Sequence, residues 1–128
     1  MPRDLAAPCE LEVRVLATLG RCSARRALGV ADVGANGQLL DTLFADVEAV
    51  PVLAAFVQSH RALHALHSGD GESALIEATR GIALAERAGD RIHRMTCLRV
   101  RARALRELGQ PARVAVTVSP VAVASSAP

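Results

Sequence analysis

Residues 52–89, VLAAFVQSHRALHALHSGDGESALIEATRGIALAERAG, decide the fold because they hold two helical patterns around one short turn. Four apolar residues of the first pattern fall within about 80° of one another at 100° per residue: Val52, Phe56, Leu63 and Leu66. Gly69 closes this helix, and Asp70 is a residue type that caps the start of the next one. The stretch therefore predicts an antiparallel helical hairpin.

The second helix of this hairpin carries a stripe of small side chains. Ala74, Ala78, Gly81 and Ala85 lie within about 60° of one another on a helix, and Gly89 marks its end. Small residues on one face let two helix backbones approach closely. The stripe therefore predicts tight packing against a neighbouring helix.

A third helix is expected from Asp90 to Leu108, where Gly109 and Pro111 end it. Its apolar residues occupy a broad arc, which is typical of a helix contacted from two sides. After Pro111 two further prolines and alternating valines argue against helix. We interpret residues 111–128 as an unstructured or extended tail that could include a short strand.

The part of the chain before Pro51 gives weaker signals. Residues 1–8 are interpreted as an N-terminal extension, followed by a helix from about residue 9 that Gly20 ends and a short helical segment from Ser23 to Leu28. Three glycines between residues 29 and 37 break the pattern, which predicts a flexible linker. A helix over residues 38–49 follows, and Pro51 stops it. The helical domain is thus expected over residues 9–110, with residues 52–108 best supported.

The composition favours an all-α protein. Hydrophobic residues make up 51% of the 128-residue chain but aromatic residues only 2%, so the core must be aliphatic and rich in alanine, which suits closely packed helices better than a sheet. The charges are segregated along the chain. Residues 91–113 contain seven arginines and one acid, Glu107, whereas residues 1–90 contain more acidic residues than arginines.

The cysteines, the N-terminus and the longest apolar run indicate where the protein is located. Cys9, Cys22 and Cys97 are odd in number and widely spaced, which is typical of reduced thiols. The N-terminus lacks the apolar run of a signal peptide, and the longest apolar run, residues 49–57, contains Pro51 and is far below the ~20 residues that span a bilayer. We expect a soluble cytoplasmic protein without a membrane partner.

The Gly-Asp turn and the small residues around it resemble a tetratricopeptide repeat. Gly69 and Asp70 form the turn, Ala74 and Gly81 occupy the two small positions after it, and Ala62 lies seven residues before Gly69.

The frame of this turn recurs further along the chain. We call the separation of Gly109 from Gly69 the repeat interval, and Arg101-Ala102 follows Arg61-Ala62 at the same interval. The repeat interval is about 40 residues, which exceeds the usual period of about 34 for this family. With this interval, the chain is similar to the helical-repeat regions of LuxR-type bacterial transcriptional regulators.

The resemblance has limits. Ala78 stands where the family has an aromatic residue, Gly20 precedes Gly69 by more than the repeat interval, and the helix expected after Gly109 is replaced by the tail. The resemblance implies antiparallel hairpins stacked as a short right-handed superhelix. It implies a protein- or peptide-interaction module, as part of or accessory to a bacterial transcriptional regulator.

Three histidines suggest an alternative function. His60, His64 and His67 are spaced i, i+4, i+7 and fall on one helix face, where imidazoles could share zinc, copper or nickel. No fourth ligand is obvious nearby, and the alternative interpretation is that they border a packed face. A small helical sensor of a ligand or metal is therefore the second hypothesis, and a homodimerisation module is the third.

The arginines are the candidate partner-binding residues. Arg99, Arg103 and Arg106 form one stripe, Arg94 lies near it, and Arg61 and Arg101 recur in register. The stripe could be a solvated face or could bind an anionic partner. Direct nucleic-acid binding is disfavoured, because no aromatic residue is available nearby to stack on a base. Arg61 and Arg101 could clamp a carboxylate, or pair with Glu77 and similar neighbours.

No catalytic constellation is present in the sequence. The serines lack a Gly-x-Ser-x-Gly elbow, no cysteine stands beside a histidine, and a chain without lysine cannot form a lysine-containing phosphate loop. We expect no enzymatic activity and no cofactor.

Overall fold

The computed structural model contains five α-helices in the residues it describes, 2–29 and 33–109, with side chains described from residue 10 to 29 and from 34 to 109. The helices are α1 (Pro2–Ala27), α2 (Val33–Val47), α3 (Pro51–His67), α4 (Gly71–Ala88) and α5 (Arg91–Glu107). No strand occurs in these ranges, so the all-α expectation is confirmed for them. The tail expected over residues 111–128 lies outside the described residues.

The α3–α4 hairpin and α5 form as the sequence predicts. Asp70 caps α4 by accepting a hydrogen bond from the Ser73 backbone N–H at 3.1 Å, and Asp90 caps α5 through the N–H of His93 at 2.9 Å. Gly89 ends α4 with a φ of 67°, in the left-handed region that favours glycine.

The first half of the chain differs from expectation in two places. Helix α1 begins at Pro2, not at residue 9, and it continues through Gly20 to Ala27. It continues because Cys22 extends the buried face of Val15 and Leu19 by one more turn. Burial of that face outweighs the cost of a glycine inside a helix, which is about 1 kcal/mol.

The predicted glycine-rich linker over residues 29–37 is also wrong in its second half, because α2 already begins at Val33. Asn36 and Leu40 are both only 2% exposed and lie one turn apart, so the core-facing stripe of α2 starts earlier than apolar residues alone indicate. Gly37 lies against α3, where an added Cβ would be 3.4 Å from Nε2 of His64. Glycine here permits close packing.

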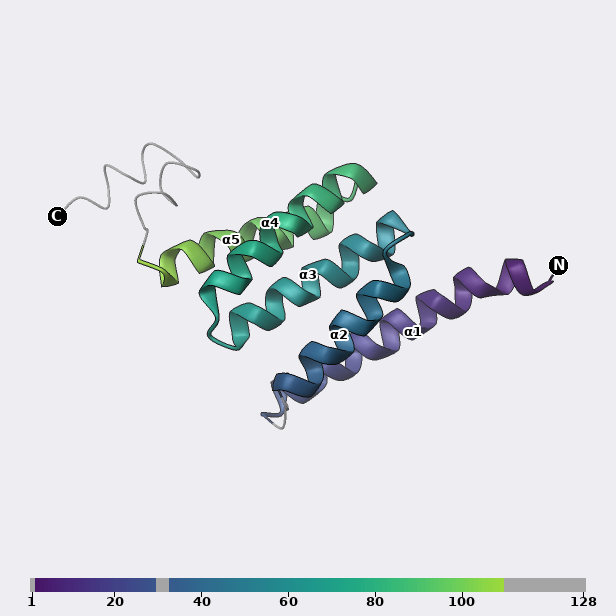
Figure 1. The fold of residues 1–128 in the computed structure, drawn as a ribbon, viewed down its shortest axis with the longest axis horizontal. Coiled ribbons are helices and arrows are strands. Elements are labelled where there is room, and N and C mark those ends of the chain that lie inside the picture. Colours follow the sequence, from purple (N-terminus) through teal and green to yellow (C-terminus); the bar gives the residue numbers. More distant parts are fainter. Residues whose placement is uncertain (1, 30–32, 110–128) are drawn as a thin grey trace.

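The helices lie in layers on either side of α3. Figure 1 shows α1 and α2 on one side of α3 and α4 and α5 on the other, with α1 behind α2 and α5 behind α4. Helix α3 contacts all four other helices, whereas α2 and α4 do not contact each other among the described residues. The chain therefore forms a row of helices with α3 at its centre and with α1 and α5 at its outer ends.

Helices α1, α3 and α5 end in register, each one repeat interval after the last, at Ala27, His67 and Glu107. A glycine with positive φ follows each end by two residues: Gly29 (70°), Gly69 (80°) and Gly109 (75°). The interval from Gly29 to Gly69 therefore equals the interval from Gly69 to Gly109. Comparison of Gly20 with Gly69 gave a longer interval because Gly20 lies inside α1 and is not a helix end.

The core has two parts, divided along α3. One part joins α1, α2 and the start of α3 through aliphatic side chains such as Leu19, Leu40 and Val57. The other joins α3, α4 and α5 mainly through alanines such as Ala62, Ala74 and Ala104. In this second part Gly81 of α4 lies so close to α5 that an added Cβ would overlap the sulfur of Cys97. The predicted small-residue contact is confirmed at this position.

Candidate interaction surfaces

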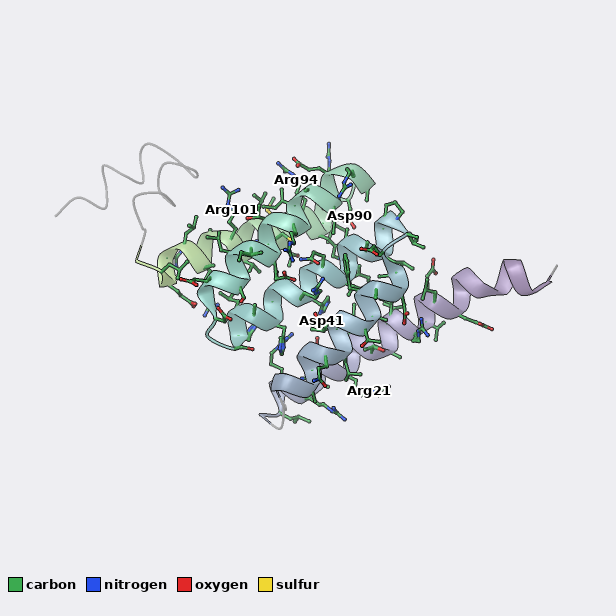
Figure 2. All side chains as sticks on the ribbon, in the orientation of Figure 1. Arg21, Asp41, Asp90, Arg94 and Arg101 are labelled. Carbon is green, nitrogen blue, oxygen red and sulfur yellow. The ribbon has the colours of Figure 1, made fainter. Side chains whose placement is uncertain are left out.

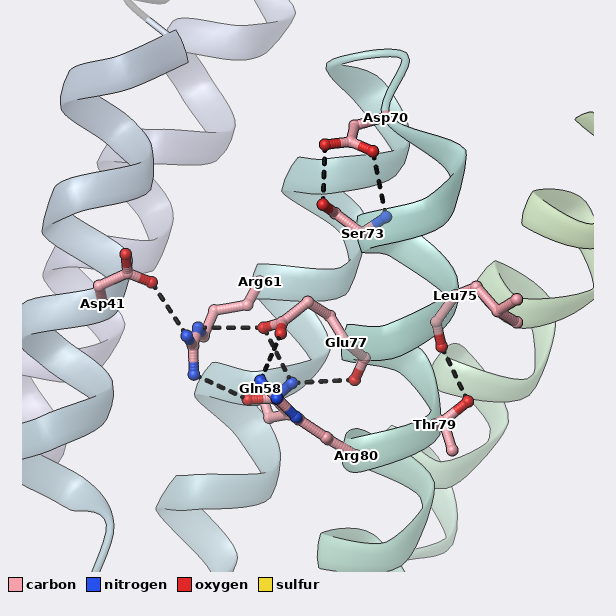
Figure 3. Close-up of polar contacts among 9 residues, drawn as sticks. All are labelled: Asp41, Gln58, Arg61, Asp70, Ser73, Leu75, Glu77, Thr79 and Arg80. Atoms are coloured by element: carbon pink, nitrogen blue, oxygen red, sulfur yellow. Dashed lines mark hydrogen bonds and ion pairs between the residues drawn. The ribbon is translucent and has the colours of Figure 1, made fainter. Parts of the chain in front are cut away.

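Arg61 is the centre of a polar network that joins three helices, shown in Figure 3. Its Nη2 lies 3.0 Å from Oδ1 of Asp41 on α2, and its Nε lies 3.2 Å from Oε2 of Glu77 on α4. Its Nη1 donates to Oε1 of Gln58 at 3.1 Å, and its guanidinium carbon lies 4.7 Å from the ring centre of Phe44. Arg61 thus ties α2 and α4 to α3 as a structural residue.

Gln58 and Arg80 complete this network. Gln58 is 1% exposed and donates through Nε2 to the backbone carbonyl of Glu77 at 2.9 Å and to its carboxylate at 3.1 Å. Arg80 contacts the other carboxylate oxygen of Glu77 at 3.0 Å. The pairing of Arg61 with Glu77 was one of the two alternatives left open by the sequence, and the structure selects it.

A cavity of about 340 Å³ opens beside this network, where α2 and α4 leave α3 uncovered. Its polar lining includes Asp41 on α2, Arg61 and His64 on α3, Asp70 at the N-cap of α4 and Glu77 further along α4. Asp70 accepts two hydrogen bonds from Ser73, and these lower the pKa of its carboxyl. The cavity is therefore a small polar depression whose charged groups already have partners.

The three histidines of α3 lie in different surroundings. His60 packs against the Phe56 ring, His64 lies beside Gly37, and Nδ1 of His67 donates to the Leu63 carbonyl at 2.8 Å. In the part of the chain that the structure describes, no group of three or more His, Cys, Asp or Glu residues could hold a metal ion. The geometry does not favour the metal-sensor hypothesis.

His60 belongs to a ring cluster that connects α3 with α5. The Phe56 ring stacks on that of His93 at 4.6 Å between centres, and the ring of His60 is tilted against Phe56 at 5.5 Å. Burial, with smaller contributions from the positive charge of Arg26 and from His93, lowers the pKa of His60 from 6.5 to about 4. His60 is therefore neutral at pH 7 and serves packing.

Two other groups, at the N-cap and in the middle of α5, have shifted pKa values. Burial alone would raise the pKa of Asp90, but hydrogen bonds from His93 outweigh it and the net shift is downward. Burial, together with the negative charge of Asp90, raises the pKa of Cys97 to about 11. Cys22 and Cys97 are both buried free thiols, and Cys97 has none of the thiolate character that a nucleophile needs.

The arginines of α5 divide into paired and unpaired residues. Arg94 contacts Glu86 at 3.3 Å, and Arg103 contacts Glu107 at 3.5 Å. Arg99, Arg101 and Arg106 make no ion pair with another described residue. Arg101, labelled in Figure 2, is half-buried, whereas Arg99 and Arg106 are exposed.

Apolar side chains accompany these arginines on the outer face of α5. Ile92 is 76% exposed and Met95 is 48% exposed, while Leu98 and Ala102 are half-buried. We call the residues that share this surface the α5 outer face; they are Ile92, Met95, Leu98, Arg99, Arg101, Ala102 and Arg106. The face combines a basic rim with an apolar centre that no other described helix covers.

A second groove lies at the opposite end of the row, between α1 and α2. It has a volume of about 600 Å³, and the Arg14–Asp46 ion pair crosses it at 3.1 Å. Leu39 and Leu43 give it a partly apolar floor.

Neither this groove nor the roles of Asp41, Gln58 and His93 have a signal in the sequence, because all depend on which helices become neighbours. In the sequence, an interaction surface is indicated by the arginines of α5, through their charge and their spacing.

None of the described helices is long and apolar enough to cross a membrane. Comparison of the chain with protein families, with curated protein sequences and with solved structures finds no match in any of the three.

Proposed function

We propose that this chain is a protein- or peptide-interaction module of the tetratricopeptide-like kind, without enzymatic activity. The observation that carries the proposal is the recurrence along the chain: α1, α3 and α5 end in register, each followed by a glycine with positive φ. Helical units that repeat in a row present extended surfaces, and proteins of this architecture use such surfaces to bind partners. The resemblance to helical-repeat regions of LuxR-type regulators extends the proposal to a role in, or accessory to, bacterial transcriptional regulation.

The chemistry of the described side chains supports binding over catalysis. The buried polar groups of the Arg61 network contact one another, and the Cys97 thiol is held in its protonated form. The exposed apolar side chains of α5 and its arginines lie on the surface, where a macromolecular partner can reach them. Association of this surface with a partner would remove apolar area from water.

Affinity capture tests this proposal. The tagged full-length chain is used as bait in an extract of cells that naturally express it, and the recovered protein is then purified separately and titrated by calorimetry. We expect one protein that binds at a fixed stoichiometry. Failure to recover any protein that rebinds in purified form would contradict the proposal.

A further inference from the structure

Helix α5 repeats α3 one repeat interval later, so its side chains can be compared position by position. Four α3 residues, Ala55, Ser59, Ala62 and Leu66, are between 0% and 7% exposed, and the neighbouring helices α4 and α5 cover this side of α3. Their counterparts on α5 are Met95, Arg99, Ala102 and Arg106, of which three are exposed and Ala102 is half-buried. Among the described residues, α5 lacks the cover that α3 has.

The arginine pair in register shows what the missing cover would supply. Arg61 of α3 is held by the carboxylate of Glu77 on α4, at 3.2 Å. Arg101, one repeat interval later, has the same place on α5 and makes no ion pair with a described residue. An acidic residue on a helix packed over α5 could reach Arg101 as Glu77 reaches Arg61.

We propose that the α5 outer face binds an acidic amphipathic helix of a partner protein, which packs on α5 as α4 packs on α3 and places a carboxylate against Arg101. The inference rests on the proposed function, since it names the surface and the chemistry of the partner. The apolar stripe of the partner helix contacts Met95, Leu98 and Ala102, and its acidic flanks face Arg99 and Arg106.

Charge complementarity selects a different protein over a second copy of this chain. Residues 91–107 contain six arginines and a single acid, Glu107, so two α5 helices packed on each other would bring like charges together. An acidic helix gains charge-assisted hydrogen bonds at the same positions. The occupant is therefore a helix with apolar and acidic faces.

A synthetic peptide provides the probe. It has the sequence of residues 71–88 with Arg80→Glu and Arg87→Glu. These changes keep the α4 packing stripe, and they remove the arginine that pairs with Glu77 within α4, so the Glu77 carboxylate of the peptide is free to contact Arg101. Binding to the full-length chain is followed by fluorescence anisotropy, and backbone amide shifts in NMR spectra map the contact. A scrambled peptide of the same composition controls for charge alone.

The decisive measurement is a double-mutant cycle between the peptide and the chain. Replacing the peptide residue that corresponds to Glu77 with Gln should weaken binding to the wild-type chain about tenfold, the expected effect of a charge-assisted hydrogen bond. The same change should have less than a twofold effect on the Arg101→Gln chain. Arg21→Gln is the matched control, because Arg21 lies one repeat interval before Arg61 on α1 and is exposed (Figure 2).

Four outcomes would overturn the α5 site. These are no binding of the acidic peptide, equal binding of the scrambled peptide, amide shifts centred on α3 instead of residues 92–106, or equal loss of binding in Arg21→Gln and Arg101→Gln. Concentration-dependent self-association that Arg101→Gln abolishes would also overturn it, because the occupant would then be a second copy. Peptide failure leaves the proposed function intact as long as affinity capture recovers a partner. If a variant does not fold, the amide shifts of the wild-type chain still show whether the peptide binds at α5.

Discussion

Helices α3 and α5 have the same length and the same relation to the turn that follows, yet they differ in burial. Each has 17 residues, and the second begins one repeat interval after the first. Nine residues of α3 are buried but only four of α5, because α3 has helices on both sides whereas α5 ends the row among the described residues. The comparison shows that neighbours, more than the helix itself, decide whether a given position is core or surface.

A buried charge should separate the two helices most strongly. Ala62 is 0% exposed, so Ala62→Asp would place an unpaired carboxylate in the alanine-rich core and should lower the free energy of unfolding by about 3–5 kcal/mol. The equivalent change on α5, Ala102→Asp, should cost less than about 1 kcal/mol because Ala102 is half-exposed. Urea denaturation of both variants measures the difference. Similar costs at the two positions would refute the comparison.

Two glycines, one at the contact of α4 with α5 and one in open space on α1, should respond to substitution in opposite ways. Gly81→Leu should lower the free energy of unfolding by about 1–3 kcal/mol, because the new side chain meets Cys97 and Gln58. Gly20→Ala in α1 should raise it by up to about 1 kcal/mol, because nothing lies within 4 Å of the added Cβ and alanine favours helix. Thermal melts followed by circular dichroism distinguish the two signs. A stabilising Gly81→Leu would mean that α4 and α5 are not in close contact.

The arginines in register should also differ. Arg61→Gln removes the partner of Asp41 and Glu77 and should cost about 1–3 kcal/mol of unfolding free energy. Arg101→Gln should change it by less than about 0.5 kcal/mol, because Arg101, although half-buried, makes no ion pair with a described residue. Chemical denaturation at low and at high salt checks this. An Arg101→Gln cost equal to that of Arg61→Gln would show that Arg101 already has a partner in the free chain.

The smallest expected effect is a pH dependence at the ring contact between α3 and α5. The pKa of His60 is 6.5 when unfolded and about 4 when folded, so between these pH values the unfolded chain binds more protons. Stability from this residue is therefore present above pH 6.5 and is lost as the pH falls toward 4. His60→Leu should flatten the curve of unfolding free energy against pH in that range, which urea denaturation at several pH values measures. An unchanged slope would contradict the lowered pKa of His60.

Much of the α3–α5 region could be predicted from its sequence because its signals are local. Asp70, Asp90, Gly69 and Gly89 act within one turn of where they stand, and they fix the ends of α3 and α4 and the start of α5. The small-residue stripe also has a local pattern, and Gly81 confirmed its meaning. These features require no knowledge of distant neighbours.

The first two helices and the polar network could not be predicted in the same way. Gly20 and Gly37 weaken helices locally, but burial of Cys22 and Asn36 against other helices maintains them. Asp41 reaches Arg61 only because α2 packs beside α3. Tertiary packing overrode local propensity in these helices, and the apolar pattern did not reveal which glycine marks the end of the first unit.

The central claim is that α5 corresponds to α3 but lacks a covering helix among the described residues. Replacing residues 110–128 with a copy of residues 70–89 should supply that cover, because Gly109 then precedes the copy as Gly69 precedes α4. Native-state hydrogen exchange of this variant should show α5 amides with increased protection, and Arg101→Gln in this background should now be as costly as Arg61→Gln. An appended segment that exchanges freely, with no change in α5 protection and a neutral Arg101→Gln, would contradict the claim.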